Sequence, residues 1–161
     1  PKEKITVLDR INDKQYEYMD KLNSQNWEIQ ADTMTILGYT CQKAITEWRG
    51  RHYEAWFASE IPINEGPMKF GGLPGLIFKL NDVDKEYNYE IEGIEKTLPI
   101  EMNIPIKQKE FIKTDRKKFV HTYRNFLKHF GLVMAAESGI DVATDASLKE
   151  KKYDLMELDI H

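Results

Sequence analysis

The chain has 161 residues, of which 41% are hydrophobic and 11% are aromatic, enough for one packed core and too many for a disordered chain. Its 23 Lys and Arg against 27 Asp and Glu give a formal charge of −4, and the basic residues are interspersed with acidic ones, which argues against nucleic-acid binding. No apolar run approaches the roughly 18 residues that a membrane-spanning helix needs. We therefore expect a single domain over residues 1–161, with no transmembrane segment in this chain.

The first part of the chain predicts short antiparallel strands. Residues 5–10 and 16–19 predict a strand pair around the turn sequence Ile-Asn-Asp. Trp27, Ile29 and Ala31 alternate with polar residues, which is typical of a half-buried strand.

The clearest hairpin is predicted for residues 39–48 and 51–58. Both segments are rich in β-branched and aromatic residues, and Arg49-Gly50 supplies a two-residue turn between them. Residues 76–82 predict a further strand, and a polar loop joins it to the alternating Tyr87, Tyr89 and Ile91. The pattern predicts an antiparallel meander of about six to eight strands, either an open sheet or one curled into a half-barrel.

The last third changes to a helical period. In residues 114–130 the apolar residues fall on one stripe, Thr114-Asp115 is suited to an N-terminal cap, and Gly131 is suited to a helix end. Residues 137–152 are small and polar and predict a loop, and residues 153–161 predict a last strand. The fold class is therefore α+β, mainly β, with an amphipathic helix near the C-terminus.

The segment 60–80 concentrates turn residues beside an apolar strand. Pro62 and Pro67 favour an extended approach, and Pro74-Gly75 suits a type II turn, so the segment is interpreted first as a rigid corner that directs a core strand. The functional alternative is that glycine lets a ligand or partner approach the backbone. Trp56, Lys69 and Phe70 are then the candidate ligand- or partner-binding residues, as an aromatic and basic lip beside the glycines.

Templates for catalysis find no match. The four histidines have no second ligand at metal-binding spacing, and no serine lies in a nucleophile elbow. Asp82, Asp84 and Glu86 resemble part of a calcium loop but lack its glycine and terminal glutamate. Pro74 interrupts the one glycine-rich stretch, so no phosphate or cofactor cradle is predicted. Cys41, the single cysteine, is interpreted as a small buried hydrophobe. We predict no catalytic residue, no metal ligand and no cofactor.

Residues 38–82 resemble the GLPGLI (Porph_ging) family of exported Bacteroidetes proteins. The match includes Gly38-Tyr39, Arg49-Gly50-Arg51, Ala55-Trp56-Phe57 and the sequence GLPGLI at 72–77. The resemblance implies an exported protein, periplasmic, outer-membrane-associated or extracellular, with a TonB-dependent outer-membrane receptor or another envelope protein as partner. It also implies that this chain, which does not begin with Met, is the C-terminal part of a longer protein. It implies no activity.

Two functions remain open from the sequence. The first is non-enzymatic binding of a protein partner or of a small or lipid ligand through the sheet, where lipid binding rests on analogy of shape alone. The alternative is a hydrolase with a dispersed active site, because a triad assembled from distant residues leaves no local motif. A pocket that holds a His, Ser or carboxylate set within hydrogen-bond reach favours the hydrolase.

Overall fold

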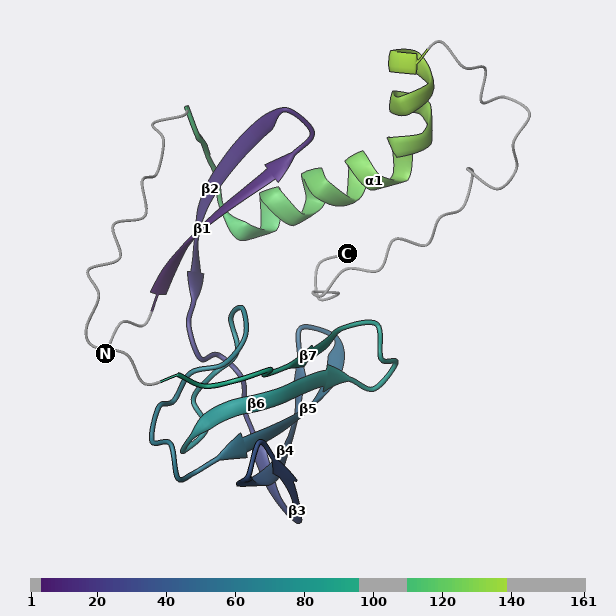
Figure 1. The fold of residues 1–161 in the computed structure, drawn as a ribbon. Coiled ribbons are helices and arrows are strands. Elements are labelled where there is room, and N and C mark those ends of the chain that lie inside the picture. The colour runs from purple at the N-terminus through teal and green to yellow at the C-terminus, as the bar shows by residue number, and fades with distance from the viewer. Residues whose placement is uncertain (1–3, 96–109, 139–161) are drawn as a thin grey trace. The chain divides into compact units, whose positions relative to one another are not determined.

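The structure is a computed structural model that describes residues 4–95 and 110–138. Its elements are β1 (Lys4–Ile11), β2 (Lys14–Lys21), β3 (Glu28–Ile36), β4 (Tyr39–Trp48), β5 (Arg51–Ala58), β6 (Leu76–Asp82), β7 (Asn88–Glu90), β8 (Ile112–Lys113) and α1 (Arg116–Ser138) (Figure 1). The prediction of a mainly β, α+β fold with an antiparallel sheet and a helix near the C-terminus is confirmed. In the described part of the chain, neither sheet closes into a barrel.

The chain divides into two compact units. The larger unit contains the five-stranded sheet β3-β4-β5-β6-β7, and the smaller unit contains nearly all of β1 and β2 together with β8 and α1. The single domain over residues 1–161 stays a prediction.

The larger sheet is a meander in which each strand is antiparallel to the next (Figure 1). In the central hairpin, Trp48 pairs with Arg51 and Gln42 pairs with Phe57. Arg49 and Gly50, with φ of 50° and 79°, form the turn, and two positive φ values match the twist of a tight hairpin. The predicted pairing of 39–48 with 51–58 is confirmed.

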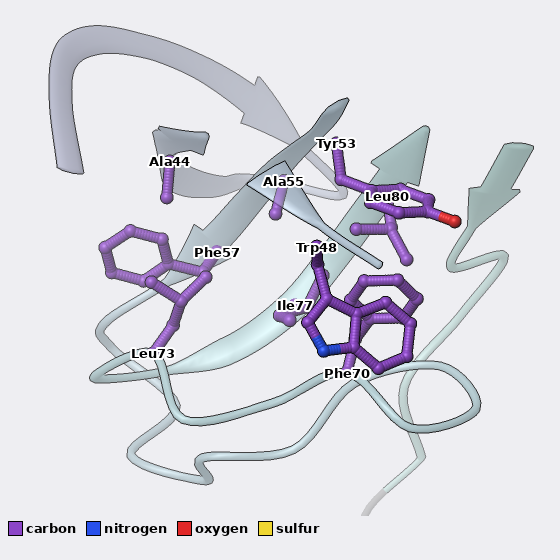
Figure 2. Packing of buried hydrophobic residues seen from close by; sticks show 9 residues of the cluster. All are labelled: Ala44, Trp48, Tyr53, Ala55, Phe57, Phe70, Leu73, Ile77 and Leu80. Carbon is purple, nitrogen blue, oxygen red and sulfur yellow. The ribbon is translucent and has the colours of Figure 1, made fainter. Parts of the chain in front are cut away.

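The core of the larger unit lies against one face of this sheet. Trp48, Tyr53 and Phe70 meet there, since the Phe70 ring centroid lies 4.6 Å from that of Tyr53 and 4.9 Å from that of Trp48 (Figure 2). The segment between β5 and β6 supplies Phe70 and Leu73, so this long connection folds back and covers the strands. The full cluster is Ala44, Trp48, Tyr53, Ala55, Phe57, Phe70, Leu73, Ile77 and Leu80.

Strand β3 lies at one edge of the sheet and is more exposed than its alternation suggests. The strand itself is confirmed, but Ile29 is 47% exposed and Ala31 is exposed too. The pairing with β4 shifts register between Ile29 and Thr33. An irregular edge strand loses part of its contact with the neighbouring strand, which accounts for the missing buried face.

The smaller unit packs α1 on a small sheet of order β1-β2-β8, in which β8 is parallel to β2. Phe119 is 3% exposed and stacks on Tyr18 with ring centroids 4.9 Å apart. The Asp115 carboxylate accepts a hydrogen bond of 2.9 Å from the Lys118 backbone N–H, so the predicted N-terminal cap is confirmed.

The predicted helix end at Gly131 is wrong, because α1 continues to Ser138. An interior glycine costs a helix only about 1 kcal/mol, and the next residues, Leu-Val-Met-Ala-Ala-Glu, include several strong helix formers. The predicted loop over residues 137–152 is therefore wrong at residues 137 and 138, which belong to α1. The rest of it, with the predicted strand 153–161, lies outside the described residues. Among described helices, none has the length and apolar content needed to cross a membrane.

Candidate functional site

The segment between β5 and β6 is held by backbone hydrogen bonds at several points. Leu76 N–H donates to Ile61 C=O at 3.0 Å, and Gly72 N–H donates to Asn64 C=O at 3.0 Å. Gly72 has φ of 86°, whereas Gly75 does not have a positive φ, so the type II turn expected at Pro74-Gly75 is wrong and the left-handed residue of this corner is Gly72. The segment is therefore a folded platform, as its interpretation as a rigid corner predicts.

The chain between β2 and β3 fixes the other side of this platform. The Trp27 indole N–H donates to Gly71 C=O at 2.9 Å, and the Gln25 amide donates to Lys69 C=O at 3.0 Å. A Cβ on Gly71 would lie 2.7 Å from the Asn64 carbonyl oxygen and would also meet the Asn23 side chain, so only glycine fits this position. The glycines thus serve packing within the chain.

The predicted binding residues Trp56, Lys69 and Phe70 do not share one surface. Phe70 is 1% exposed and lies in the core of Figure 2, where it packs on Trp48 and Tyr53. Trp56 is 8% exposed and belongs to a different cluster, with Cys41 and Phe78. Lys69 is 9% exposed. Their role in binding stays a prediction.

A groove of about 470 Å³ lies where β6 and β7 meet the segment 65–67, and it is the candidate site. Ile91 N–H donates to Phe78 C=O at 2.8 Å, whereas Ile77 N–H donates to Glu65 C=O at 3.0 Å. One part of β6 is therefore hydrogen-bonded to β7 and the chain that follows it, and the neighbouring part is hydrogen-bonded to the segment at Glu65; the groove lies where these two neighbours of β6 meet. Its lining is Glu65, Gly66, Pro67, Leu76, Ile77, Phe78, Lys79, Leu80, Asn88, Tyr89, Glu90 and Ile91.

The chemistry available in the groove is limited. Burial raises the pKa of the Tyr89 hydroxyl, so this group is a neutral donor at physiological pH. Lys79 Nζ lies 2.8 Å from Glu90 Oε2, which leaves Glu65 as the other carboxylate in the lining. The lining residues include no serine, cysteine or histidine, so the groove offers apolar surface and hydrogen-bonding groups but no nucleophile with its base. Glu65, Tyr89 and Glu90 were missed as site residues because alternation along a strand does not reveal which strand end borders a groove.

The calcium-like residues form a cluster whose charge is partly neutralised. Oxygens of Asp82, Asp84 and Glu86 lie within 4.8 Å of one another. Arg51 Nη1 lies 2.9 Å from Asp82 and 3.1 Å from Glu86. A guanidinium at this position disfavours a cation, so the cluster is interpreted as part of the hairpin's own structure.

Cys41 is 0% exposed, and desolvation raises the pKa of its thiol, as expected of a structural cysteine. Its interpretation as a small buried hydrophobe is confirmed. Ser24 accepts a hydrogen bond of 2.9 Å from the Trp48 indole N–H. Neither residue is arranged as a nucleophile in the described structure.

Comparison with known proteins gives one family match. The family described as "N-glycanase peptide, N-terminal domain" matches residues 3–124. Two solved structures of PNGF-II, in different crystal forms, are similar in fold, with 15% and 19% identity and TM-scores of 0.50 and 0.48. They cover 77% and 76% of this chain, but this chain covers only 23% and 22% of theirs, so it spans about a quarter of their length. No curated protein matches the chain.

These findings correct the resemblance to the GLPGLI family, which is wrong. The family that matches is that of the N-glycanase N-terminal domain, and the described fold resembles PNGF-II. The expectation that this chain is a binding protein of the GLPGLI family is therefore wrong. The physical reason lies in the motif itself: Gly71, Gly72 and Gly75 meet packing and backbone demands of a folded corner, so similar residues indicate a similar corner and not a particular family. The receptor and lipid partners inferred from the sequence stay predictions.

Proposed function

Because this chain belongs to the family of N-glycanase N-terminal domains, we propose that it is the N-terminal domain of a longer hydrolase that removes N-linked glycans from glycoproteins. The single observation that carries the proposal is the match over residues 3–124, which includes β1 to β8 and the start of α1. This function corresponds to the hydrolase alternative left open by the sequence, and it places the chain at the front of a longer protein. The earlier placement at the C-terminus rested on the GLPGLI resemblance.

In this proposal the catalytic groups lie outside the chain. Three pairs of charged side chains near the groove and on the sheet are engaged with each other: Lys79 with Glu90, Lys43 with Glu54, and Arg51 with Asp82. Hydrolysis of a glycosidic or amide bond needs a positioned acid and base or an activated nucleophile. In the candidate groove Glu90 is paired with Lys79, which leaves Glu65 as the other carboxylate of the lining. The domain then contributes a folded platform to the enzyme.

An enzyme with this substrate must meet glycoproteins where they occur, which is outside the cytoplasm of the organism that makes them or on the surface of another cell. We therefore propose that the protein is exported. Fractionation of cells into cytoplasm, envelope and medium, followed by immunoblotting, tests the location. Recovery in the cytoplasm alone would contradict it.

The central experiment compares the full-length gene product with the 161-residue chain. Each is incubated with a glycoprotein that carries one N-linked glycan, and the released peptide and glycan are analysed by mass spectrometry, which also identifies the bond that is cleaved. We expect glycan release by the full-length product and none by the 161-residue chain. No release by the full-length product would overturn the proposed function. Release by the 161-residue chain would overturn the placement of catalysis elsewhere.

A further inference from the structure

The five-stranded sheet has apolar side chains on both faces. The core of Figure 2 covers one face. The opposite face, called the second face below, carries the buried residues Cys41, Trp56, Ala58 and Phe78. Five half-buried side chains pack against them: Ile36, Tyr39, Ile61, Leu76 and Ile91. An antiparallel sheet that meets only water on one side normally places polar residues there, so this composition indicates a covered face.

Exposed apolar side chains extend the second face toward β3. Met34 pairs with Cys41 across β3 and β4, so the two side chains point to the same side, and Met34 is 38% exposed. Ile45 follows Cys41 on β4 at an even spacing and is 37% exposed. Ile29 provides a contrast, since it pairs with Ala44 and points to the other face of the same sheet while 47% exposed.

Two ion pairs border this surface. Lys43 Nζ lies 2.6 Å from Glu54 Oε2, and Lys79 Nζ lies 2.8 Å from Glu90 Oε2. Asp32 and Glu60 add negative charge near Lys43 and Cys41, so the rim has no excess of positive charge and does not favour a nucleic acid or an anionic membrane. An apolar centre containing Met and aromatic residues, bordered by polar pairs, has the composition of a protein interface.

Trp56 gives no open ring surface for a sugar. Its side chain is 8% exposed, its indole N–H donates to Glu54 Oε1 at 3.0 Å, and Lys43 Nζ lies 5.6 Å from the ring centroid. A sugar-binding aromatic platform needs an exposed ring face, which these contacts reduce. The second face therefore fits a protein surface better than a glycan.

We propose that the second face, centred on Met34 and Ile45, docks on the catalytic part of the same polypeptide. This inference rests on the proposed function. The PNGF-II chain continues far beyond the matched part, since this chain covers 23% of it, so in a protein of similar extent most of the polypeptide lies outside the structure described. A domain of the same chain is present at high effective concentration, which allows a modest apolar surface to be covered without a strong charge attraction between the two partners.

Cysteine accessibility in the full-length protein tests the docking, with Ile45→Cys as the probe and Ile29→Cys as the matched control. Both residues are exposed isoleucines near the β3 edge of the sheet, and they point to opposite faces. Each variant is labelled with a maleimide under native conditions and in denaturant, and mass spectrometry separates the new site from Cys41. For each variant, the labelling rate under native conditions is divided by its rate in denaturant. We expect this ratio to be at least about tenfold smaller for Ile45→Cys than for Ile29→Cys, because a docked surface reacts only when it opens. Similar normalised rates for the two sites would overturn the proposal.

A photo-cross-linking amino acid in place of Ile45 identifies the occupant. A cross-link within one molecule to a peptide beyond residue 161 supports the proposal. A cross-link to a second copy, to another protein or to residues 96–109 or 139–161 overturns it, as does the absence of any protein cross-link. Glycan release by the unmodified full-length protein is measured in parallel. If release occurs but Ile45 is not protected, the docking fails while the proposed function stands; if no release occurs, the proposed function fails by itself.

Discussion

Arg51 Nη1 lies 2.9 Å from Asp82 Oδ2, and the two side chains are 4% and 1% exposed. The other Asp82 oxygen accepts a hydrogen bond of 2.8 Å from the Tyr87 backbone N–H. This buried pair therefore joins the start of β5 to the turn between β6 and β7. Glu86 also reaches Arg51, at 3.1 Å, but it is 48% exposed.

Removing one partner of this pair should be costly. We expect Asp82→Ala to lower the free energy of unfolding by about 3–5 kcal/mol, because the Arg51 charge stays buried without its main partner. Glu86→Gln is the control and should cost less than about 1 kcal/mol, since solvent screens an exposed pair. Urea denaturation of each purified variant provides the measurement. Equal losses for the two variants would show that burial does not set the strength of this network.

Glycine substitutions separate packing from backbone strain. A Cβ on Gly75 would collide with the Ala58 carbonyl group, whereas Gly38 has φ of 82° and open space around it. We expect Gly75→Ala to cost about 3 kcal/mol through overpacking against backbone, and Gly38→Ala about 1 kcal/mol through its left-handed conformation alone. Thermal unfolding followed by circular dichroism compares them. A larger loss for Gly38→Ala would contradict the close packing at Gly75.

In the smaller unit, Phe119 should matter more than Phe126. Phe119 is 3% exposed and contacts Tyr16, Tyr18 and Tyr123, whereas Phe126 is only half-buried beside the same cluster. Phe119→Ala should cost about 3–5 kcal/mol, and Phe126→Ala should cost distinctly less. The midpoints of chemical denaturation give the comparison. The opposite order would place the main contact of α1 further along the helix.

The cap of α1 predicts a pH dependence. The hydrogen bond from the Lys118 backbone N–H lowers the pKa of the Asp115 carboxyl from its ordinary value of 3.8. A lowered folded-state pKa means that the cap stabilises the helix fully above pH 3.8 and that this contribution is lost as the pH falls through the folded-state pKa.

Asp115→Asn keeps an accepting oxygen at the cap and removes the titration. The stability difference between wild type and this variant should therefore be constant at neutral pH and change only in acid. Carbon NMR of the Asp115 carboxyl should give a titration midpoint below 3.8. A midpoint above that value would show that the hydrogen bond does not persist in solution.

Cys41 should be inert in the folded protein. It is 0% exposed, and burial raises the pKa of its thiol, so both access and thiolate formation are reduced. We expect slow reaction with a maleimide in buffer and rapid reaction in denaturant, with Cys41→Ser as the blank. Rapid labelling in buffer at an intact circular dichroism spectrum would indicate local opening of β4.

The predictions from the sequence succeeded where the signal is local. Arg49-Gly50 between two β-rich segments specifies its hairpin, because a two-residue turn leaves only one register to its strands. Asp115 specifies a helix start because its carboxylate accepts a hydrogen bond from the backbone N–H of Lys118, three residues later in the chain. The residues of the groove could not be predicted from local pattern, because Glu65 lies in a different segment from Tyr89 and Glu90. They line one groove because the segment at Glu65 and strand β7 both lie beside β6.

What the sequence determined by itself is therefore the strands of the meander, the main turn and the start of the helix with its cap, all of which depend on residues within a few positions of one another. Tertiary structure alone decided that Phe70 belongs to the core, on the face of the sheet opposite Trp56, although the sequence placed both residues on one lip beside the glycines. It also decided that Gly71 leaves room for the Asn64 carbonyl group and the Asn23 side chain. These outcomes depend on contacts between residues far apart in the chain. Which segment packs against a given side chain decides whether that side chain is buried, and the local sequence pattern does not specify that segment.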